Sequence, residues 1–349
     1  MALESKQLTN ILELKDVNVS FTVESSKLHI LRDVSLQVPR GSFLCIVGES
    51  GCGKSVTAQA IVQLLPENGR VDSGLISYYE NGQTSELNKL EKFGREMRSF
   101  RGAKIGMIFQ DTLSSLNPAH RVGRQVAESL LQHHKLSKDE AKERVIELFS
   151  KLGIPDPERR YNAYPHEFSG GMRQRVMIAI ATICEPDLVI ADEPTTALDV
   201  TIQAQIMTLL KNLQRSAKRT FILITHNMAL VSEVADHVAV MYLGRVVEYG
   251  TVDQVLRTPR HPYTQALLQS VPSLDADKNV ELKTVDGQTP SPAEVTKGCE
   301  FAERCLFATD TCRDQIIPLV TFEGNHQVRC IRLDEKGNLP KQNNVGSNV

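Results

Sequence analysis

Apolar and polar residues alternate in two early segments of the chain, residues 17–21 and 34–38. A period of two is typical of strands buried on one face, so these segments predict a pair of antiparallel strands near the N-terminus. Three later runs, residues 43–47, 188–191 and 221–225, are almost entirely apolar, with Thr225 at the end of the third. Continuous apolar runs of this length are typical of strands that are buried on both faces of a sheet.

Helical periodicity separates these apolar runs. Residues 56–65 show helical spacing directly after the first run, and apolar residues between Val145 and Leu152 form a stripe with charged residues on the other side. Strands that alternate with helices predict an α/β fold with a mostly parallel sheet. Ligands of such sheets bind beyond the carboxyl ends of the strands, and all three apolar runs end in residues that can do chemistry.

Length and composition limit the possibilities further. A chain of 349 residues favours two domains, and a net charge of −2 argues against a nucleic-acid partner. The N-terminus lacks the pattern of a signal peptide, and the longest charge-free apolar run, 176–184, is far shorter than the roughly 20 residues that span a bilayer. We therefore expect synthesis in the cytosol and no membrane-spanning segment.

The first candidate site follows the run at 43–47. The chain there fits the pattern G-x-x-x-x-G-K-[ST] between a predicted strand and a predicted helix, with the residues Gly48, Glu49, Ser50, Gly51, Cys52, Gly53, Lys54 and Ser55. Glycines allow backbone N–H groups to surround phosphate oxygens, and a helix N-terminus adds positive potential. We expect Lys54 to reach the β- and γ-phosphates of a nucleotide and Ser55 to bind Mg²⁺.

The other two apolar runs end in candidate catalytic residues. Asp192 and Glu193 follow the run at 188–191, where Asp192 could hold Mg²⁺ and Glu193 could act as general base for an attacking water. His226 follows the run at 221–225 and could contact the γ-phosphate or orient the water. Gln110 could lie near Mg²⁺ and the water as a sensor. Taken singly, each could also be an ordinary loop or strand-end residue.

A second small-residue turn, Ser169-Gly170-Gly171, opens another predicted helix. Such a turn also suits a phosphate, but the loop at 48–55 already supplies one. The second turn suggests that the chain supplies half of a site that belongs to another subunit.

In this order, the loop at 48–55, Gln110, Phe168-Ser169-Gly170-Gly171-Met172, Asp192-Glu193, Ala197-Leu198-Asp199 and His226 resemble the ATP-binding subunits of ABC transporters. The resemblance covers residues 11 to about 270. It implies a P-loop ABC ATPase cassette (1–270) with an N-terminal antiparallel β subdomain and a helical signature subdomain at about 111–180.

The same resemblance assigns roles across two subunits. It implies that Ser169, Gly170 and Gly171 bind the γ-phosphate of ATP held by the opposite subunit, and that Asp199 links the two sites. Phe21 matches the aromatic residue that stacks on adenine, although it could equally be a core residue of its strand. Met172 stands where the family's commonest form has glutamine, while the three residues that would contact phosphate are intact.

A narrower resemblance points to the importer branch that handles peptides and nickel. It rests on Phe109-Gln110-Asp111, Leu116-Asn117-Pro118, Tyr164-Pro165-His166, the segment 261–268 and a C-terminal cysteine pattern. The "D" type subunit of dipeptide/oligopeptide importers is the nearest match.

That match implies partners and a location. The partners are two membrane-spanning permease subunits, a second related ATP-binding subunit and a substrate-binding protein, and the location is the cytoplasmic face of the bacterial plasma membrane, as a peripheral protein. Oligosaccharides or nickel complexes are alternative cargoes. A soluble, non-transport ATPase of the same fold is the alternative from another class, and a decayed subunit that only scaffolds its partner is a third.

Four cysteines crowd into a C-terminal segment that we place at 298–333, after a linker at 271–297 and before a disordered tail at 334–349. They are spaced C-x5-C-x6-C-x17-C, at Cys299, Cys305, Cys312 and Cys330. In a cytosolic protein such a cluster favours metal over disulfides, but the tight first pair of a structural zinc site is absent. Spacing leaves an iron–sulfur cluster, zinc or four unligated thiols open. The resemblance implies a [4Fe–4S] cluster.

Overall fold

The computed structural model describes residues 10–24, 26–111, 115–196, 198–270, 287–294 and 297–340. Its first sheet has the strand order β2-β1-β4-β5 and is antiparallel. The strands are β1 (Asn10–Val23), β2 (Ser26–Pro39), β4 (Gly69–Glu80) and β5 (Gln83–Glu86). The two strands expected near the N-terminus are confirmed as β1 and β2, whereas alternation did not reveal β4 and β5.

The second sheet has the order β11-β12-β10-β9-β3-β8-β7-β6. Its strands are β3 (Phe43–Val47), β6 (Ile105–Ile108), β7 (Leu188–Asp192), β8 (Thr220–Ile224), β9 (His237–Tyr242), β10 (Arg245–Thr251), β11 (Val320–Thr321) and β12 (Gln327–Val328). The five strands from β9 to β6 are parallel, as predicted, and the other three add antiparallel pairs at one edge.

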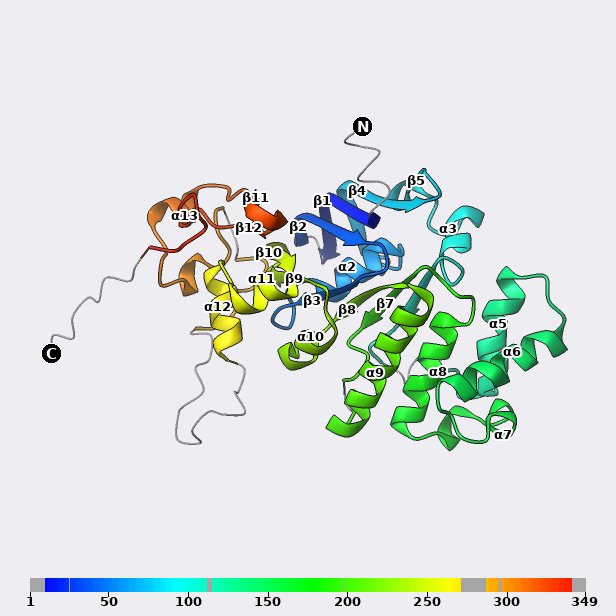
Figure 1. The fold of residues 1–349 in the computed structure, drawn as a ribbon. Helices are drawn as coiled ribbons and strands as arrows, with labels where there is room; N and C mark the ends of the chain where they lie inside the picture. The colour runs from blue at the N-terminus through cyan, green and yellow to red at the C-terminus, as the bar shows by residue number, and fades with distance from the viewer. Residues whose placement is uncertain are drawn as a thin grey trace.

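Helices cover and extend this sheet (Figure 1). The α-helices are α2 (Lys54–Ile61), α3 (Arg95–Phe100), α5 (Val122–His133), α6 (Lys138–Lys151), α7 (Pro157–Tyr161), α8 (Gly170–Thr182), α9 (Val200–Ala217), α10 (Met228–Val234), α11 (Val252–Arg257), α12 (Pro262–Gln269) and α13 (Asp310–Asp314). Short 3-10 helices lie at Leu87–Lys89, Pro165–Glu167, Ala302–Arg304 and Glu323–Asn325. Among the described helices, none is both long and apolar enough to cross a membrane.

One helix is shorter than its periodicity predicted. Helical spacing continues to Leu65, but α2 ends at Ile61 and Gln63 adopts a left-handed conformation with a φ of 50°. The chain then turns toward β4. Periodicity marks which residues can face the core, but it does not define where a helix stops.

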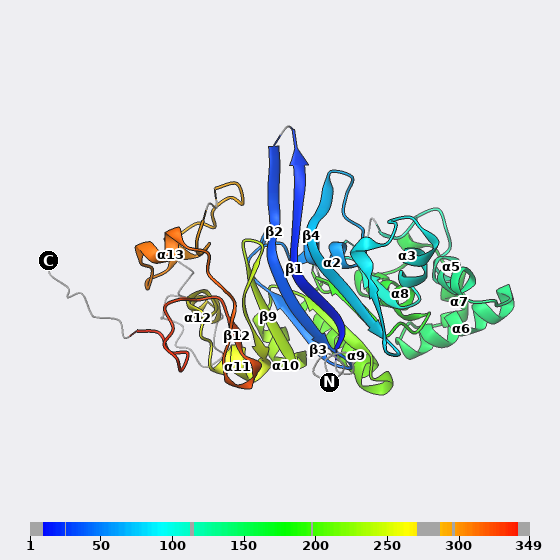
Figure 2. The ribbon, with the colours of Figure 1, turned by 90° about the horizontal axis from the view of Figure 1, so that it is seen from above.

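The helices α5 to α8 are inserted between β6 and β7; α5, α6 and α7 form one end of the molecule and α8 packs next to the sheet, whereas α12 and α13 lie at the other end (Figures 1 and 2). The predicted stripe lies on α6, where Val145 and Phe149 are fully buried. A capping box of Ser137 and Glu140 starts this helix.

Strand β3 separates two hydrophobic cores. Phe43, Cys45 and Val47 pack into one cluster, and Leu44 and Ile46 pack into the other. Successive side chains of a strand point to opposite faces, so a continuous apolar run serves both clusters. The buried position of β3 fixes the loop that follows it at the carboxyl edge of the sheet.

The C-terminal segment joins the edge of the same sheet. Strand β12 pairs with β10, where Val328 lies opposite Glu248. His326 Nε2 lies 2.7 Å from Glu248 Oε1, and both side chains are buried. Most of the expected linker (271–286 and 295–296) and most of the expected tail (341–349) lie outside the described residues. At the start of the expected tail, Asp334 N–H donates to Asn338 O at 3.0 Å in a turn.

Candidate nucleotide site

The loop between β3 and α2 has a conformation that only glycine allows at two positions. Gly48 has a φ of 150°, and a Cβ there would lie 2.2 Å from the carbonyl oxygen of Met241. Gly53 has a φ of 100°, and a Cβ there would lie 2.7 Å from Leu31 Cδ2. These constraints place backbone N–H groups of the loop directly before the N-terminus of α2.

Lys54 lies buried beneath this loop, with 5% of the residue exposed. Its Nζ donates to the carbonyl oxygens of Gly48 and Glu49, each at 2.9 Å, and lies 3.8 Å from Cys52 Sγ. Among the described residues, no carboxylate forms an ion pair with it. A buried ammonium whose partners are neutral is stabilised by an anion, so the loop fits the phosphates of a nucleotide.

Ser55, in the first turn of α2, meets Asp192 at the end of β7. Ser55 Oγ donates to Asp192 Oδ1 at 2.9 Å. Burial of Asp192, which is 4% exposed, raises its pKa; the charge of Glu193 raises it further, while the Ser55 hydrogen bond opposes both. A hydroxyl and a buried carboxylate at this spacing are hard oxygen ligands, which suit Mg²⁺.

Glu193 is the centre of the next group of contacts. It has a left-handed φ of 44°, and its N–H donates to Ile224 O at 2.9 Å, which ties β7 to β8. Its carboxylate accepts from Gln110 Nε2 at 3.0 Å and lies 3.3 Å from His226 Nδ1. The structure therefore brings together three candidate catalytic residues from the ends of β6, β7 and β8.

Sequence reasoning missed Thr196, whose Oγ1 donates to Glu193 Oε2 at 2.9 Å. No motif marks this threonine, since its role depends on a turn that folds it back over the carboxylate. With two donors on Oε2, the Glu193 side chain is held in one orientation, and a positive φ at a functional carboxylate is a strain that surrounding contacts must maintain.

The second turn has different surroundings. Ser169 is the N-cap of α8, where its Oγ accepts from the Met172 N–H at 3.4 Å. Ser169 and Gly170 are exposed, and the nearest neighbour of a Cβ at Gly170 would be Leu198 at 3.5 Å. Asp199 caps α9 and accepts from the Ile202 N–H at 2.9 Å. Ala197, expected in the same motif, lies outside the described residues.

Phe21 lies near the end of β1, opposite Gly69 of β4. It is partly buried and packs against one hydrophobic cluster, and a Cβ at Gly69 would lie 3.0 Å from its ring. This position is compatible with a core residue and with an aromatic platform, so the adenine contact stays a prediction.

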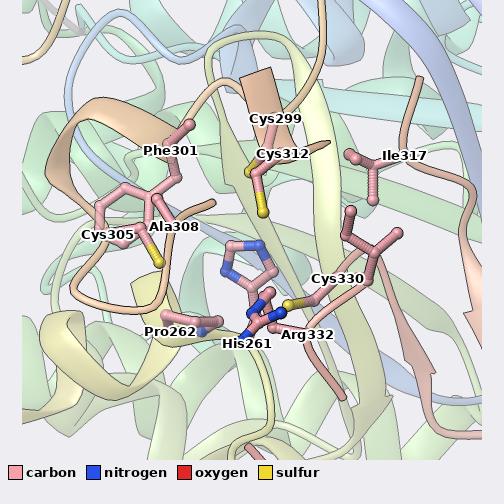
Figure 3. Close-up of a pocket in the computed structure, with 12 residues that line it drawn as sticks. His261, Pro262, Cys299, Phe301, Cys305, Ala308, Cys312, Ile317, Cys330 and Arg332 are labelled. Carbon is pink, nitrogen blue, oxygen red and sulfur yellow. The ribbon is translucent and has the colours of Figure 1, made fainter. Parts of the chain in front are cut away.

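The four C-terminal cysteines line one pocket together with His261, as Figure 3 shows. All four are free thiols. Burial raises the pKa of Cys299 to about 12 and that of Cys330 to about 11, and it also raises the pKa of Cys305. Within the described ranges, no group of three or more His, Cys, Asp or Glu side chains stands close enough to hold a metal ion. The four cysteines thus line one pocket without forming a metal-binding arrangement, and the bound group stays a prediction.

Known proteins are similar to this chain over nearly its whole length. A family model described as ABC transporter matches residues 31–196, and one described as oligopeptide/dipeptide transporter, C-terminal region, matches residues 247–312. The dipeptide transport ATP-binding protein DppD of Bacillus subtilis (strain 168) is 46% identical over 94% of this chain and 96% of its own length. The chain belongs to the ABC transporter ATP-binding proteins. The family and the fold inferred from the sequence are thereby confirmed, and the chain is an ATPase.

Further proteins similar to this ABC ATPase are also named as ATP-binding proteins or cassettes. The oligopeptide transport ATP-binding protein OppD of the same organism is 46% identical over 93% of this chain and 89% of its own length. Among solved structures, the dimeric ATP-binding cassette MJ0796 bound to ADP and Pi is 28% identical, with a TM-score of 0.61, over 69% of this chain and 98% of that one.

Proposed function

We propose that this chain is the ATP-hydrolysing subunit of a membrane importer of dipeptides and oligopeptides. The observation that carries the cargo assignment is full-length similarity, at 46% identity, to proteins named for dipeptide and oligopeptide transport. The match of residues 247–312 to the C-terminal region of that transporter class adds to it. Oligosaccharides or nickel complexes remain the alternative cargoes of the same branch.

Within the cassette, we assign phosphate binding to the loop at 48–55 and ATP hydrolysis to the residues that follow β6, β7 and β8. Lys54 and the backbone N–H groups of residues 48–55 bind the β- and γ-phosphates. Ser55, Asp192 and Gln110 hold Mg²⁺, which neutralises phosphate charge when bound. The support is the Ser55–Asp192 hydrogen bond and the buried ammonium of Lys54, whose hydrogen bonds go to the carbonyl oxygens of Gly48 and Glu49.

Glu193 takes a proton from the attacking water, and His226 and Gln110 orient that water. Three side chains already lie against the Glu193 carboxylate, so its direction is set before a nucleotide binds. General-base catalysis depends on such fixed geometry. Phe21 stacks on adenine in this proposal.

The second turn acts on another subunit. We assign Ser169, Gly170 and Gly171 to the γ-phosphate of ATP held by a second, related ATP-binding subunit, so that two subunits close over two nucleotides. Exposure of Ser169 and Gly170 and the helix N-terminus behind them support this role. Closure of the dimer drives two membrane-spanning permease subunits, which receive cargo from a substrate-binding protein. This chain lies on the cytoplasmic face of the bacterial plasma membrane.

We propose that the ATP-binding cassette spans residues 1–270 and that a C-terminal extension spans residues 298–333. The four cysteines of this extension hold a [4Fe–4S] cluster. Four sulfurs that line one pocket support this assignment, and zinc is the alternative. Protein purified without oxygen should be brown and contain iron and acid-labile sulfide. Colourless protein with stoichiometric zinc would favour the alternative.

The importer proposal is tested by reconstitution. The chain is coexpressed with its permeases and second ATPase, placed in proteoliposomes and supplied with the substrate-binding protein and a radiolabelled dipeptide. We expect ATP-dependent uptake that Lys54→Ala abolishes. Uptake of a nickel complex or an oligosaccharide in place of the dipeptide would refute the cargo, and ATP hydrolysis by a chain that copurifies with no permease would refute the importer.

A further inference from the structure

The C-terminal extension reaches directly into the phosphate loop. Arg304 Nη1 donates to Glu49 Oε2 at 2.8 Å, and Nη2 donates to Glu49 Oε1 at 3.1 Å. The two residues are 255 positions apart, and the Arg304 side chain is only 5% exposed. A two-pronged contact of a guanidinium with a carboxylate is the strongest and most directional form of ion pair in proteins.

Aromatic residues of the cassette and the extension hold Arg304 in this position. Its Nη1 donates to the hydroxyl of Tyr242 at 3.2 Å, and its guanidinium lies 5.8 Å from the ring centroids of both Tyr242 and Phe301. Phe301 packs edge-on against Tyr242, with ring centroids 5.3 Å apart. This cage fixes the guanidinium before any nucleotide binds.

Glu49 in turn is held from several sides. Thr289 Oγ1 donates to its Oε2 at 2.7 Å, and its N–H donates to the hydroxyl of Tyr263 at 2.9 Å. Its carbonyl oxygen accepts from Lys54 Nζ at 2.9 Å. Burial alone would raise the pKa of Glu49, but the hydrogen bonds from Arg304 and Thr289 outweigh it, so the pKa lies below its ordinary value. The carboxylate is therefore charged at neutral pH.

A charged carboxylate in this loop has an electrostatic consequence. The loop receives a polyanion, and a carboxylate on its second residue repels phosphate unless a cation compensates it. Arg304 supplies that cation and turns the carboxylate toward the extension. We propose that Arg304 is a positioning residue for ATP: it neutralises Glu49 and keeps that carboxylate turned away from the phosphates that Lys54 and the backbone N–H groups bind. This inference rests on the proposed nucleotide site at 48–55.

Arg304→Gln in the full-length chain tests the proposal. Loss of a charged two-pronged contact should weaken ATP binding about tenfold and raise the KM for ATP to match, while kcat changes less than twofold. Arg313→Gln is the matched control, because Arg313 lies in the same extension and pairs with the exposed Glu303. It should leave the dissociation constant of ATP unchanged. Unchanged ATP binding in Arg304→Gln would overturn the proposal.

A second variant separates charge compensation from mere docking of the extension. In Arg304→Gln/Glu49→Gln the repulsive carboxylate is gone, so ATP affinity should return to within about threefold of wild type. Affinity as weak as in Arg304→Gln alone would overturn the proposal. Glu49→Gln alone should bind ATP at least as tightly as wild type, which keeps the test valid if Arg304→Gln does not fold. Lys54→Ala must lose ATP binding in the same assay; if it does not, the nucleotide site itself is misassigned.

Discussion

Two glycine-containing turns in this chain open helices suited to phosphate, and their surroundings differ. The loop at 48–55 joins the buried strand β3 to α2, and Asp192 at the end of β7 contacts its Ser55. Ser169 and Gly170 of the turn at 169–171 are exposed, and the nearest neighbours of a Cβ at Gly170 or Gly171 would be Leu198 or Ile202 at the start of α9. A phosphate-binding backbone is therefore not a complete site. Among the described residues, the chain's own candidate catalytic groups lie beside the first turn, and our proposal assigns the second turn to a site of another subunit.

The largest effect should come from the catalytic side of the first turn. Glu193→Gln keeps the contacts to Gln110 and Thr196 possible but removes the base, so ATP hydrolysis should fall about a thousandfold while ATP binding persists. Phosphate release and nucleotide binding measure the two quantities. Hydrolysis at the wild-type rate would show that Glu193 is not the base.

A negative charge at the second turn, 169–171, should lower ATPase activity only in the assembled complex. Ser169→Glu places a carboxylate at the exposed N-terminus of α8, where it would repel phosphate held by the second subunit. ATPase activity of the complex should fall about fiftyfold, with ATP binding to the isolated chain unchanged.

Ser137→Glu is the control for this variant, since Ser137 is also an exposed N-cap serine but belongs to α6. It should leave the activity of the complex within about twofold of wild type. Equal losses in both variants would mean that helix capping, and not phosphate binding, explains the result.

Stability should distinguish the same two turns. Gly48→Ala forces a Cβ against Met241 O at a φ of 150°, so the free energy of unfolding should fall by about 2 kcal/mol. Gly170→Ala lies in a helix first turn with ordinary space around it and should change stability by no more than about 0.5 kcal/mol. Urea denaturation of both variants measures this difference, and equal losses would contradict it.

The smallest effect concerns pH. Burial raises the pKa of Asp192, so above the ordinary carboxyl value near pH 4 the folded state binds more protons than the unfolded state, and stability falls as pH rises. Asp192→Asn removes this cost and should raise the Tm by about 2 °C at pH 7 without nucleotide, while activity is lost. The gain should vanish near pH 4. A lower Tm at pH 7 would show that Asp192 stabilises the free protein.

Much of the fold could be predicted because the signals are local. The runs at 43–47, 188–191 and 221–225 are strands, and the residues that follow them do meet at one edge of the sheet. The strands β4 and β5 were missed because their burial patterns are mixed. The pairing of β12 with β10 was also missed, since two-residue strands carry no periodicity and their partners lie far away in the sequence.

The sequence by itself determined the family, the phosphate loop and the identity of the catalytic candidates, because those depend on residue types at short spacing. Tertiary structure alone decided that Thr196 holds Glu193 and that Arg304 pairs with Glu49. The physical reason is separation: a contact across 255 residues depends on how the sheet edge, the aromatic cage and the extension pack together. No local pattern encodes that packing.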